Sequence, residues 1–232
     1  MVDSTVVEST VVESTVVEST VVEVAPRNRD RIARRQVDKF AERRDQLAGA
    51  ALQTLAELGY ARTSLRDIAQ NSDFSHGVLH YYFSDKIDLI TYCVRRCKAE
   101  CVTRYDHVVA TAASADELRL GFAAALAATL REDAPMHRLW YDLRNQSLFD
   151  ASFRSDVLEI DQSLEQMIWR VVTRFAELAQ APLVVSSSVA YGIFDGLFQQ
   201  ALLRQVTDES GGVAGRLQDS AESVLESLIV AR

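Results

Sequence analysis

The scarcity of glycine and proline constrains this chain more than any other feature of its sequence. Its 232 residues include only 9 glycines and 3 prolines, the residues that tight turns and β-hairpins need most. An all-β sandwich or barrel is therefore disfavoured, while 48% hydrophobic residues suffice to fill a core. The sequence predicts an all-α fold in one or two domains.

Cysteine usage and hydropathy favour a cytoplasmic protein. The three cysteines are an odd number without a loop-rich framework, which is not typical of a secreted disulfide scaffold. The first residues lack the charged and apolar regions of a signal peptide, and no stretch reaches the roughly 18 apolar residues of a membrane span. We expect a soluble protein without a membrane partner.

Residues 1–25 carry a pentapeptide repeat. Val-Val-Glu-Ser-Thr recurs from positions 6, 11 and 16. A period of five matches neither a helix nor a strand, so no face is consistently apolar. We expect a disordered tail. A strand-forming interaction segment and a wrongly assigned start codon stay open as alternatives.

A basic run follows the repeat. Residues 27–44 hold eight basic and three acidic side chains. Such a run is usually a solvated arm, but arms of this kind also contact phosphates or the minor groove of DNA. We assign residues 26–36 to a basic arm and leave both roles open.

Residues 37–85 predict three helices. Apolar residues recur at steps of three and four over residues 37–58, and Gly59 follows at a helix stop. Thr63 or Ser64 can cap a short second helix that ends near Asn71, and Ser75 can cap a third. Two short helices joined by a tight turn indicate a helix-turn-helix with its core at residues 64–83.

Residues 43–89 resemble the N-terminal domain of the tetracycline-repressor (TetR) family of transcriptional regulators. The matching residues are Leu47, Ala50, Ala51, Gly59, Tyr60, Thr63, Ile68, Ala69, Ser75, Gly77, Leu79, Tyr81, Tyr82, Phe83, Lys86 and Leu89. The resemblance implies a regulator, most often a repressor, that binds a pseudo-palindromic operator in double-stranded DNA as a homodimer. It also implies that residues 86–232 form a helical domain that binds a small-molecule effector and dimerises through its last two helices.

The third predicted helix has the residues of a recognition helix. Its N-terminal end must present short or polar side chains to the major groove. We expect DNA contacts from Thr63, Ser64, Ser75, His76, Gly77, Val78, His80, Tyr81, Tyr82 and Lys86. The family usually has a basic residue near His76, a hydroxyl residue at Val78 and a tyrosine at His80. These departures leave the operator sequence open, and for His80 packing without base contact is an equal alternative.

Aromatic and polar residues concentrate between residues 105 and 198, which favours an effector pocket. The predicted lining is Tyr105, His107, Trp140, Tyr141, Arg144, Asn145, Phe149, Trp169 and Phe194. Ordinary core packing is the alternative for each aromatic residue. The sequence does not identify the effector.

Six helices are predicted beyond residue 85, over residues 86–110, 115–132, 136–148, 152–179, 183–206 and 214–230. Asp195, Gly196 and Leu197 resemble a family pattern in which glycine lets two helices pack closely across a dimer interface. The predicted interface residues are Gly196, Leu197, Phe198, Leu202, Val224, Leu225 and Leu228. Packing within one chain is an equal alternative for each of them.

Cys93, Cys97 and Cys101 recur every fourth residue and so share one helix stripe. A thiol or metal sensor is one interpretation. A straight helix cannot wrap three thiols around one ion, so we predict no metal site and expect buried packing.

Sequence motifs of enzymes are absent. The chain has no glycine-rich phosphate loop, HExxH pair or nucleophile elbow. We therefore expect no enzymatic activity and no cofactor. The competing class is a helical bundle that binds or transforms a small molecule, but its activity would not need the helix-turn-helix.

The net charge of −8 is unevenly distributed. Residues 26–100 hold 14 basic and 10 acidic side chains, whereas residues 101–232 hold 11 and 18. The predicted DNA-binding end is therefore basic in spite of the acidic total.

Overall fold

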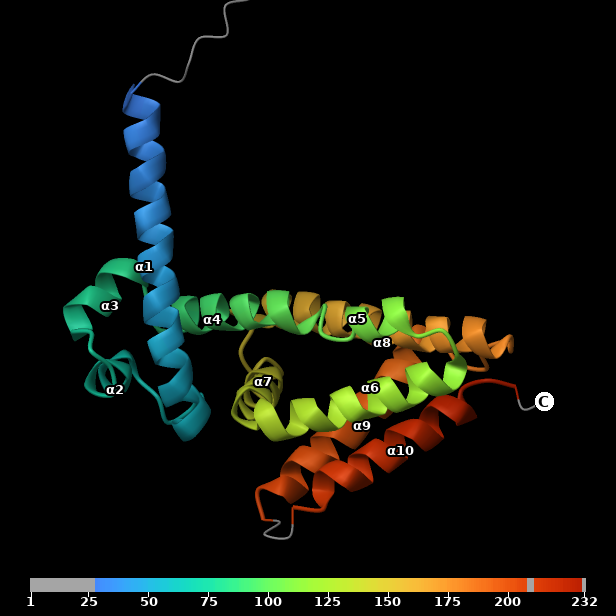
Figure 1. The fold of residues 1–232 in the computed structure, drawn as a ribbon. Helices are drawn as coiled ribbons and strands as arrows, with labels where there is room; N and C mark the ends of the chain where they lie inside the picture. Colours follow the sequence, from blue (N-terminus) through green and yellow to red (C-terminus); the bar gives the residue numbers. More distant parts are fainter. Residues whose placement is uncertain (1–27, 208–210, 231–232) are drawn as a thin grey trace, which may run out of the picture. The chain divides into compact units, whose positions relative to one another are not determined.

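The computed structural model describes residues 28–207 and 211–230, with side chains from residue 35 onward except those of residues 97–100. These residues form ten helices and no strand (Figure 1), which confirms the all-α prediction. The pentapeptide repeat lies outside the described residues. None of the described helices is both long and apolar enough to cross a bilayer.

The packing of the described residues divides them into two parts, with the boundary between Ala41 and Glu42. Helix α1 (Asn28–Leu58) begins in the first part and ends in the second. Its start lies nine residues before the predicted one, so residues 28–36 of the predicted basic arm are helical. Their arginine, alanine and glutamine are good helix formers. The predicted domain boundary after residue 85 stays a prediction.

Helices α2 (Leu65–Gln70) and α3 (His76–Tyr82) form the helix-turn-helix (Figure 1). Ser64 and Asp67 form a capping box at α2, because each side chain bonds the other residue's backbone N–H. Ser75 caps α3 by accepting a hydrogen bond from the backbone of Val78. The caps that the sequence predicted are therefore confirmed.

A small core holds the helix-turn-helix together. Its members are almost fully buried and come from α1, α2, α3 and the start of the next helix; they are Leu47, Leu55, Ile68, Leu79, Phe83 and Leu89. Arg44 covers this core, with its guanidinium 4.5 Å from the ring centres of both Phe83 and Tyr92. It also bonds Asp88 at 2.8 Å. Arg44, part of the predicted basic run, therefore serves packing.

Seven further helices follow. They are α4 (Lys86–Cys101), α5 (Asp106–Thr111), α6 (Ala115–Glu132), α7 (Ala134–Gln146), α8 (Arg154–Ala179), α9 (Ser187–Gln205) and α10 (Val213–Ser227). Helix α10 packs against α6 and α9, and α8 packs against α6 and α9. Leu118, Phe122, Leu130, Phe194 and Leu225 lie in the resulting core.

The predicted helix over residues 86–110 is wrong in one respect, because the chain breaks at residues 102–105. Turn hydrogen bonds run from Arg104 N to the Cys101 carbonyl and from Asp106 N to the Thr103 carbonyl. The break buries the Tyr105 ring edge-on against Phe122, with 4.9 Å between ring centres. It also brings Arg104 into an ion pair with Asp133.

The last two helices are shorter than predicted. An antiparallel bridge joins Leu183 to Ile229, and Val230 N donates to the Pro182 carbonyl at 3.0 Å. Residues 182–184 and 228–230 are therefore paired with each other and are not helical. Pro182, predicted at a helix start, lies in this pairing, whereas Pro135 does stand in the first turn of α7.

Candidate functional site

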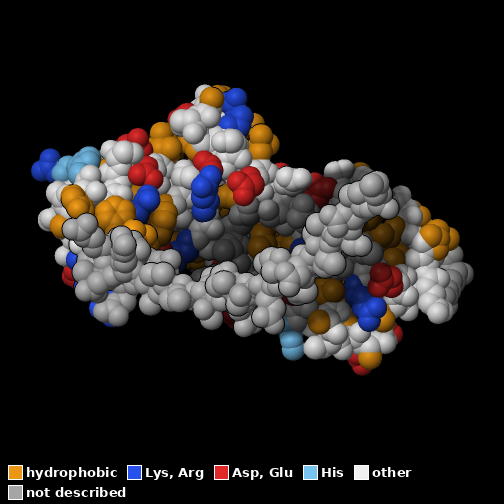
Figure 2. Space-filling model, turned by 90° about the horizontal axis from the view of Figure 1, so that it is seen from above, with side chains coloured by type: hydrophobic (Ala, Val, Ile, Leu, Met, Phe, Trp, Pro, Cys, Tyr) orange, Lys and Arg blue, Asp and Glu red, His pale blue; other side chains and the backbone are white. Residues whose placement is uncertain are grey.

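Helix α3 has one buried and one exposed face. Leu79 is fully buried and Val78 and Tyr82 are half-buried against the core. Ser75, His76, Gly77, His80 and Tyr81 are exposed, and histidine side chains are visible on the surface over α3 in Figure 2. The His76 and His80 rings meet edge-on at 4.4 Å. A Cβ added at Gly77 would meet nothing within 4 Å, so this part of the backbone is open to a binding partner.

Two residues predicted to contact DNA are engaged within the chain. Thr63 is 3% exposed, and its hydroxyl donates to the Gly59 carbonyl at 2.7 Å. The Lys86 ammonium donates to the Tyr60 carbonyl at 2.8 Å and lies 4.0 Å from the centre of the Tyr60 ring. Both side chains satisfy carbonyls just after the end of α1, where the helix leaves such acceptors unpaired.

Hydrogen bonds join the end of α1 to the start of α4 and to α7. Gly59 has a left-handed backbone with φ of +78°, and Tyr60 N donates to Oδ2 of Asp142 on α7 at 2.6 Å. Burial lowers the pKa of Lys86, and the nearby Asp142 carboxylate partly offsets that effect. We call Gly59, Tyr60, Lys86 and Asp142 the α1–α7 junction.

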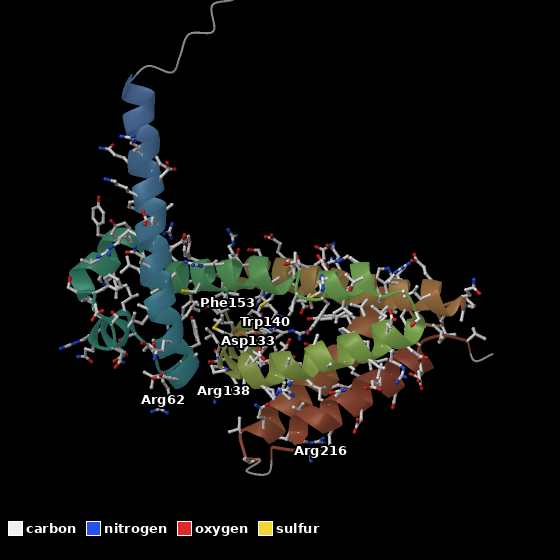
Figure 3. The ribbon with its side chains drawn as sticks, viewed as in Figure 1. Arg62, Asp133, Arg138, Trp140, Phe153 and Arg216 are labelled. Carbon is white, nitrogen blue, oxygen red and sulfur yellow. The ribbon has the colours of Figure 1, made fainter. Side chains whose placement is uncertain are left out.

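Two basic side chains near the helix-turn-helix were missed from the sequence. Arg62 and Arg66 are exposed, and the Arg62 side chain points away from the helices in Figure 3. They lie on either side of the α2 N-cap, where backbone N–H groups already favour anions. An isolated arginine carries no periodic signal. The structure shows that both side chains are exposed at the start of α2.

Two adjoining cavities lie among α4, α6, α7, α8 and α9. The larger has a volume of about 150 Å³ and is lined by Val94, Cys101, Arg104, Asp133, Met136, His137, Leu139, Trp140, Ile160 and Leu164. The smaller has a volume of about 60 Å³ and is lined by Tyr105, Leu126, Thr129, His137, Trp140, Tyr141, Leu164, Met167, Ile168, Tyr191, Phe194, Asp195 and Phe198. His137, Trp140 and Leu164 border both, and Figure 3 shows Trp140 and Asp133 among these helices.

The charged groups of the cavities are mostly paired. Arg104 forms an ion pair with Asp133 and also donates to the Thr129 hydroxyl at 3.1 Å. Arg144 donates to Asp195 at 2.5 Å, and Tyr141 donates to the same carboxylate at 2.9 Å. Burial, followed by the charge of Asp195, raises the pKa of the Tyr141 hydroxyl, which therefore stays a donor.

His137 is the one histidine that borders the cavities. Its ring lies 4.6 Å from that of Phe198. Burial, followed by the positive charge of Arg104, lowers its pKa to about 4. The imidazole is therefore neutral near pH 7 and offers one donor and one acceptor.

The structure divides the predicted effector residues into two groups. Tyr105, Trp140, Tyr141 and Phe194 border the cavities. His107, Asn145 and Phe149 are exposed, Phe149 by 88%, and half-buried Trp169 borders neither cavity. Arg144 reaches the site only through Asp195. His107, Asn145 and Phe149 lie on helix faces and in a turn that point to solvent, and their role as effector contacts stays a prediction.

Comparison with known protein families identifies the helix-turn-helix. Residues 47–93 match the family of bacterial regulatory proteins named tetR. This stretch contains the end of α1, both short helices and the first half of α4. The chain is therefore similar to the tetR family over residues 47–93.

Curated relatives are similar to about half of the chain. The HTH-type transcriptional regulators BetI of Burkholderia thailandensis and Burkholderia ambifaria are 30% and 31% identical over 115 and 114 residues, which is 48% of this chain. The matched region spans only 58% of the length of these relatives. They therefore support the family and leave this chain's activity to be proposed.

Two solved structures share the fold. FadR of Bacillus subtilis in complex with stearoyl-CoA has a TM-score of 0.63 at 19% identity, over 80% of this chain and 98% of its own. A transcriptional regulator of Saccharomonospora viridis in complex with choline has a TM-score of 0.68 at 18% identity, over 83% and 100%. At such identities the likeness concerns the fold alone.

The interface residues predicted from the tetR-family pattern are mostly buried inside one chain. Phe198, Leu202, Leu225 and Leu228 are at most 5% exposed. Gly196, Leu197 and Val224 are half-buried. The four buried side chains pack within the chain, the alternative that the sequence left open, because they face α6 and the other helices of the bundle.

A different stripe of α9 is open. Val189, Gly192, Gln199, Leu203 and Val206 are exposed and Gly196 is half-buried, and these six positions alternate steps of three and four. Leu203 is 74% and Val206 61% exposed. We call them the α9 stripe. Its spacing is that of a helix face that packs along a second helix.

The cysteines whose side chains the structure describes do not form one site. Cys93 is fully buried, and its thiol donates to the Ala48 carbonyl at 3.4 Å. Cys101 borders the larger cavity, 3.8 Å from the Arg104 guanidinium. The side chain of Cys97 lies outside the described residues. Among the described side chains, no cluster of three or more metal-ligating residues occurs.

Proposed function

We propose that this chain is a ligand-responsive transcriptional regulator that binds operator DNA through α3. The observation that carries the proposal is the open face of α3 on a tetR-family domain, with His76, His80 and Tyr81 exposed and the backbone at Gly77 accessible. Such a helix can enter the major groove and reach base edges. Repression, the usual role in the family, is the expected outcome, and the cytoplasm the expected place of action.

The proposed DNA contacts differ from the expected set. Ser64, Ser75, His76, Gly77, His80 and Tyr81 keep this role, with Val78 and Tyr82 at the edge of the surface. Thr63 and Lys86 are replaced by Arg62 and Arg66, whose exposed guanidinium groups suit phosphate oxygens. His76 and His80 then read bases, while the arginines supply affinity.

We propose that two copies of the chain pair through the α9 stripe. The apolar side chains of Val189, Leu203 and Val206 would leave water on pairing, and Gly192 and Gly196 would allow the two helices a close approach. A twofold dimer presents two α3 helices to two half-sites, so the operator is pseudo-palindromic.

Helix α7 is the proposed route from the effector to DNA. His137, Trp140 and Tyr141 border the cavities, and Asp142 on the same helix holds Tyr60 at the end of α1. A ligand that shifts α7 therefore changes the support of the helix-turn-helix. An effector that prefers the shifted state must weaken DNA binding by the same factor by which DNA weakens effector binding.

The decisive test is selection of binding sequences from a pool of random duplexes at physiological salt. Enrichment of an inverted repeat is expected. On that sequence, His76→Ala should alter the base preference, whereas Arg62→Ala should weaken binding to all sequences and reduce the salt slope by about one. Recovery of unrelated sequences, bound no better than a random duplex, would refute the proposal.

A further inference from the structure

The size and the lining of the cavities indicate the chemical class of the effector, which the fold alone does not. Solved neighbours of this fold hold ligands as different as stearoyl-CoA and choline. The larger cavity here has a volume of about 150 Å³ and adjoins one of about 60 Å³, below the usual range of roughly 300–1,000 Å³ for drug-sized ligands. A compact molecule therefore fits within these cavities.

Among the wall residues whose side chains the structure describes, no charge is left unpaired for a ligand. Arg104 and Asp133 neutralise each other at the larger cavity. At the smaller one, Asp195 already holds Arg144 and the Tyr141 hydroxyl, and Tyr191 and Arg144 both bond Asp161. An anion would have to displace Asp133, and a cation would have to displace the tyrosine donors. Either ion would lose its hydration without an available partner among the described side chains.

One strong donor, on a side chain that borders both cavities, has no acceptor among the described residues. The Trp140 side chain borders both cavities and is 8% exposed, and its indole N–H has no hydrogen-bond partner among the described residues. A buried N–H without a partner lowers the free energy of unfolding by roughly 1–3 kcal/mol. The neighbouring His137 is neutral near pH 7, as its lowered pKa requires. A ligand acceptor would satisfy the indole without adding charge.

We propose that the effector is an uncharged, compact and mainly apolar molecule with one hydrogen-bond acceptor, which accepts from the Trp140 indole N–H. The inference rests on the proposed regulatory function and specifies the ligand class of that site. Val94, Leu139, Ile160 and Leu164 receive the apolar body. The Trp140 ring would contact the apolar body of the ligand, and the Trp140 N–H would donate the hydrogen bond.

The test compares four small probes on the full chain by isothermal titration calorimetry. Acetophenone has a carbonyl acceptor, and α-methylstyrene replaces its oxygen by a methylene group. Benzoate is the anionic counterpart, and choline is a small cation. Acetophenone should bind at least about tenfold more tightly than each of the other three, since a buried donor left unpaired discriminates strongly.

Two tryptophan variants assign the effect to one residue. Trp140→Phe keeps an aromatic ring and removes the N–H, so the ratio of acetophenone to α-methylstyrene affinity should fall to about one. Trp169→Phe is the matched control, because Trp169 borders neither cavity, and should keep the ratio. Tighter binding of benzoate or choline, no binding of acetophenone at millimolar concentration, or an unchanged ratio in Trp140→Phe would overturn the inference.

The outcome is separable from that of the proposed function. Acetophenone that binds as expected and leaves operator affinity unchanged would support the ligand class and contradict the regulatory role. Operator binding that is released by choline and not by acetophenone would support the regulatory role and refute the ligand class.

Discussion

Asp142 on α7 accepts a hydrogen bond from the backbone N–H of Tyr60, with 2.6 Å between Oδ2 and N. The two residues are 82 positions apart in sequence, yet this bond fastens the end of α1 to a helix that lines the cavities. Lys86 adds a second fastening through the Tyr60 carbonyl. The α1–α7 junction therefore links the proposed DNA-binding and effector-binding parts.

Asp142→Ala should loosen this link. Loss of a charged acceptor leaves the Tyr60 N–H unpaired, and we expect the free energy of unfolding to fall by about 1–3 kcal/mol in urea titrations. Release of operator DNA by effector should also weaken. Asp156→Asn is the control, since it breaks an ion pair with largely exposed Arg95 and should cost less than about 1 kcal/mol. Equal effects of both substitutions would contradict a special role for Asp142.

Two glycine substitutions should have opposite signs. Gly59 has φ of +78°, and an added Cβ would lie 3.1 Å from the Asp142 carboxylate, so Gly59→Ala should destabilise by about 1–2 kcal/mol. Gly49 lies inside α1, where a Cβ would meet nothing within 4 Å, and Gly49→Ala should stabilise by about 0.5–1 kcal/mol. Thermal unfolding of both variants measures the difference. A stabilised Gly59→Ala would show that the junction does not restrain the turn.

His137 should make the fold sensitive to acid. Its pKa is lowered from 6.5 to about 4 by burial and by Arg104, against the opposite effects of Asp133 and Asp195. The unfolded chain therefore takes up this proton first, and stability is lost as the pH falls from above 6.5 toward 4. Between pH 7 and pH 5 the loss should be about 2 kcal/mol.

Urea titrations of His137→Gln should lack this component of the pH dependence. His107→Gln is the matched control because His107 is exposed, and it should retain the full loss. If His137→Gln and the unsubstituted protein lose stability in parallel over that pH interval, the buried neutral imidazole is not its source.

Leu203→Glu should break the proposed dimer. Leu203 is 74% exposed in one chain, so the substitution spares the core and places a carboxylate in the α9 stripe, where pairing would bury it. Sedimentation velocity should show at least a tenfold weaker association. Leu120→Glu, on α6 and 48% exposed, should leave association unchanged. A dimer that survives Leu203→Glu would place the interface elsewhere.

Local sequence signals predicted much of the fold. Helix caps at Ser64 and Ser75 and the helix stop at Gly59 depend on residues within one turn of each other, so spacing alone reveals them. The break after Cys101 was missed, because its cause is the burial of Tyr105 against Phe122 and the ion pair of Arg104 with Asp133. These partners lie on α6 or just beyond it.

The choice among candidate residues needed the tertiary structure. Sequence composition places aromatic residues in the C-terminal region, but Trp140 and Phe149 differ only in whether a neighbouring helix covers them. Helix α9 is apolar on several faces, so periodicity cannot separate the buried face with Phe198 and Leu202 from the open face with Leu203.

The sequence by itself therefore determined the all-α class, the helix-turn-helix and its resemblance to one family, because each depends on residue spacing along the chain. Only the tertiary structure decided which side chains remain available. It placed Thr63 and Lys86 at the end of α1, brought Asp142 to Tyr60, and left the indole N–H of Trp140 without a partner among the described residues. These hydrogen bonds and buried contacts form between residues that are distant in sequence, and local periodicity cannot predict such pairs.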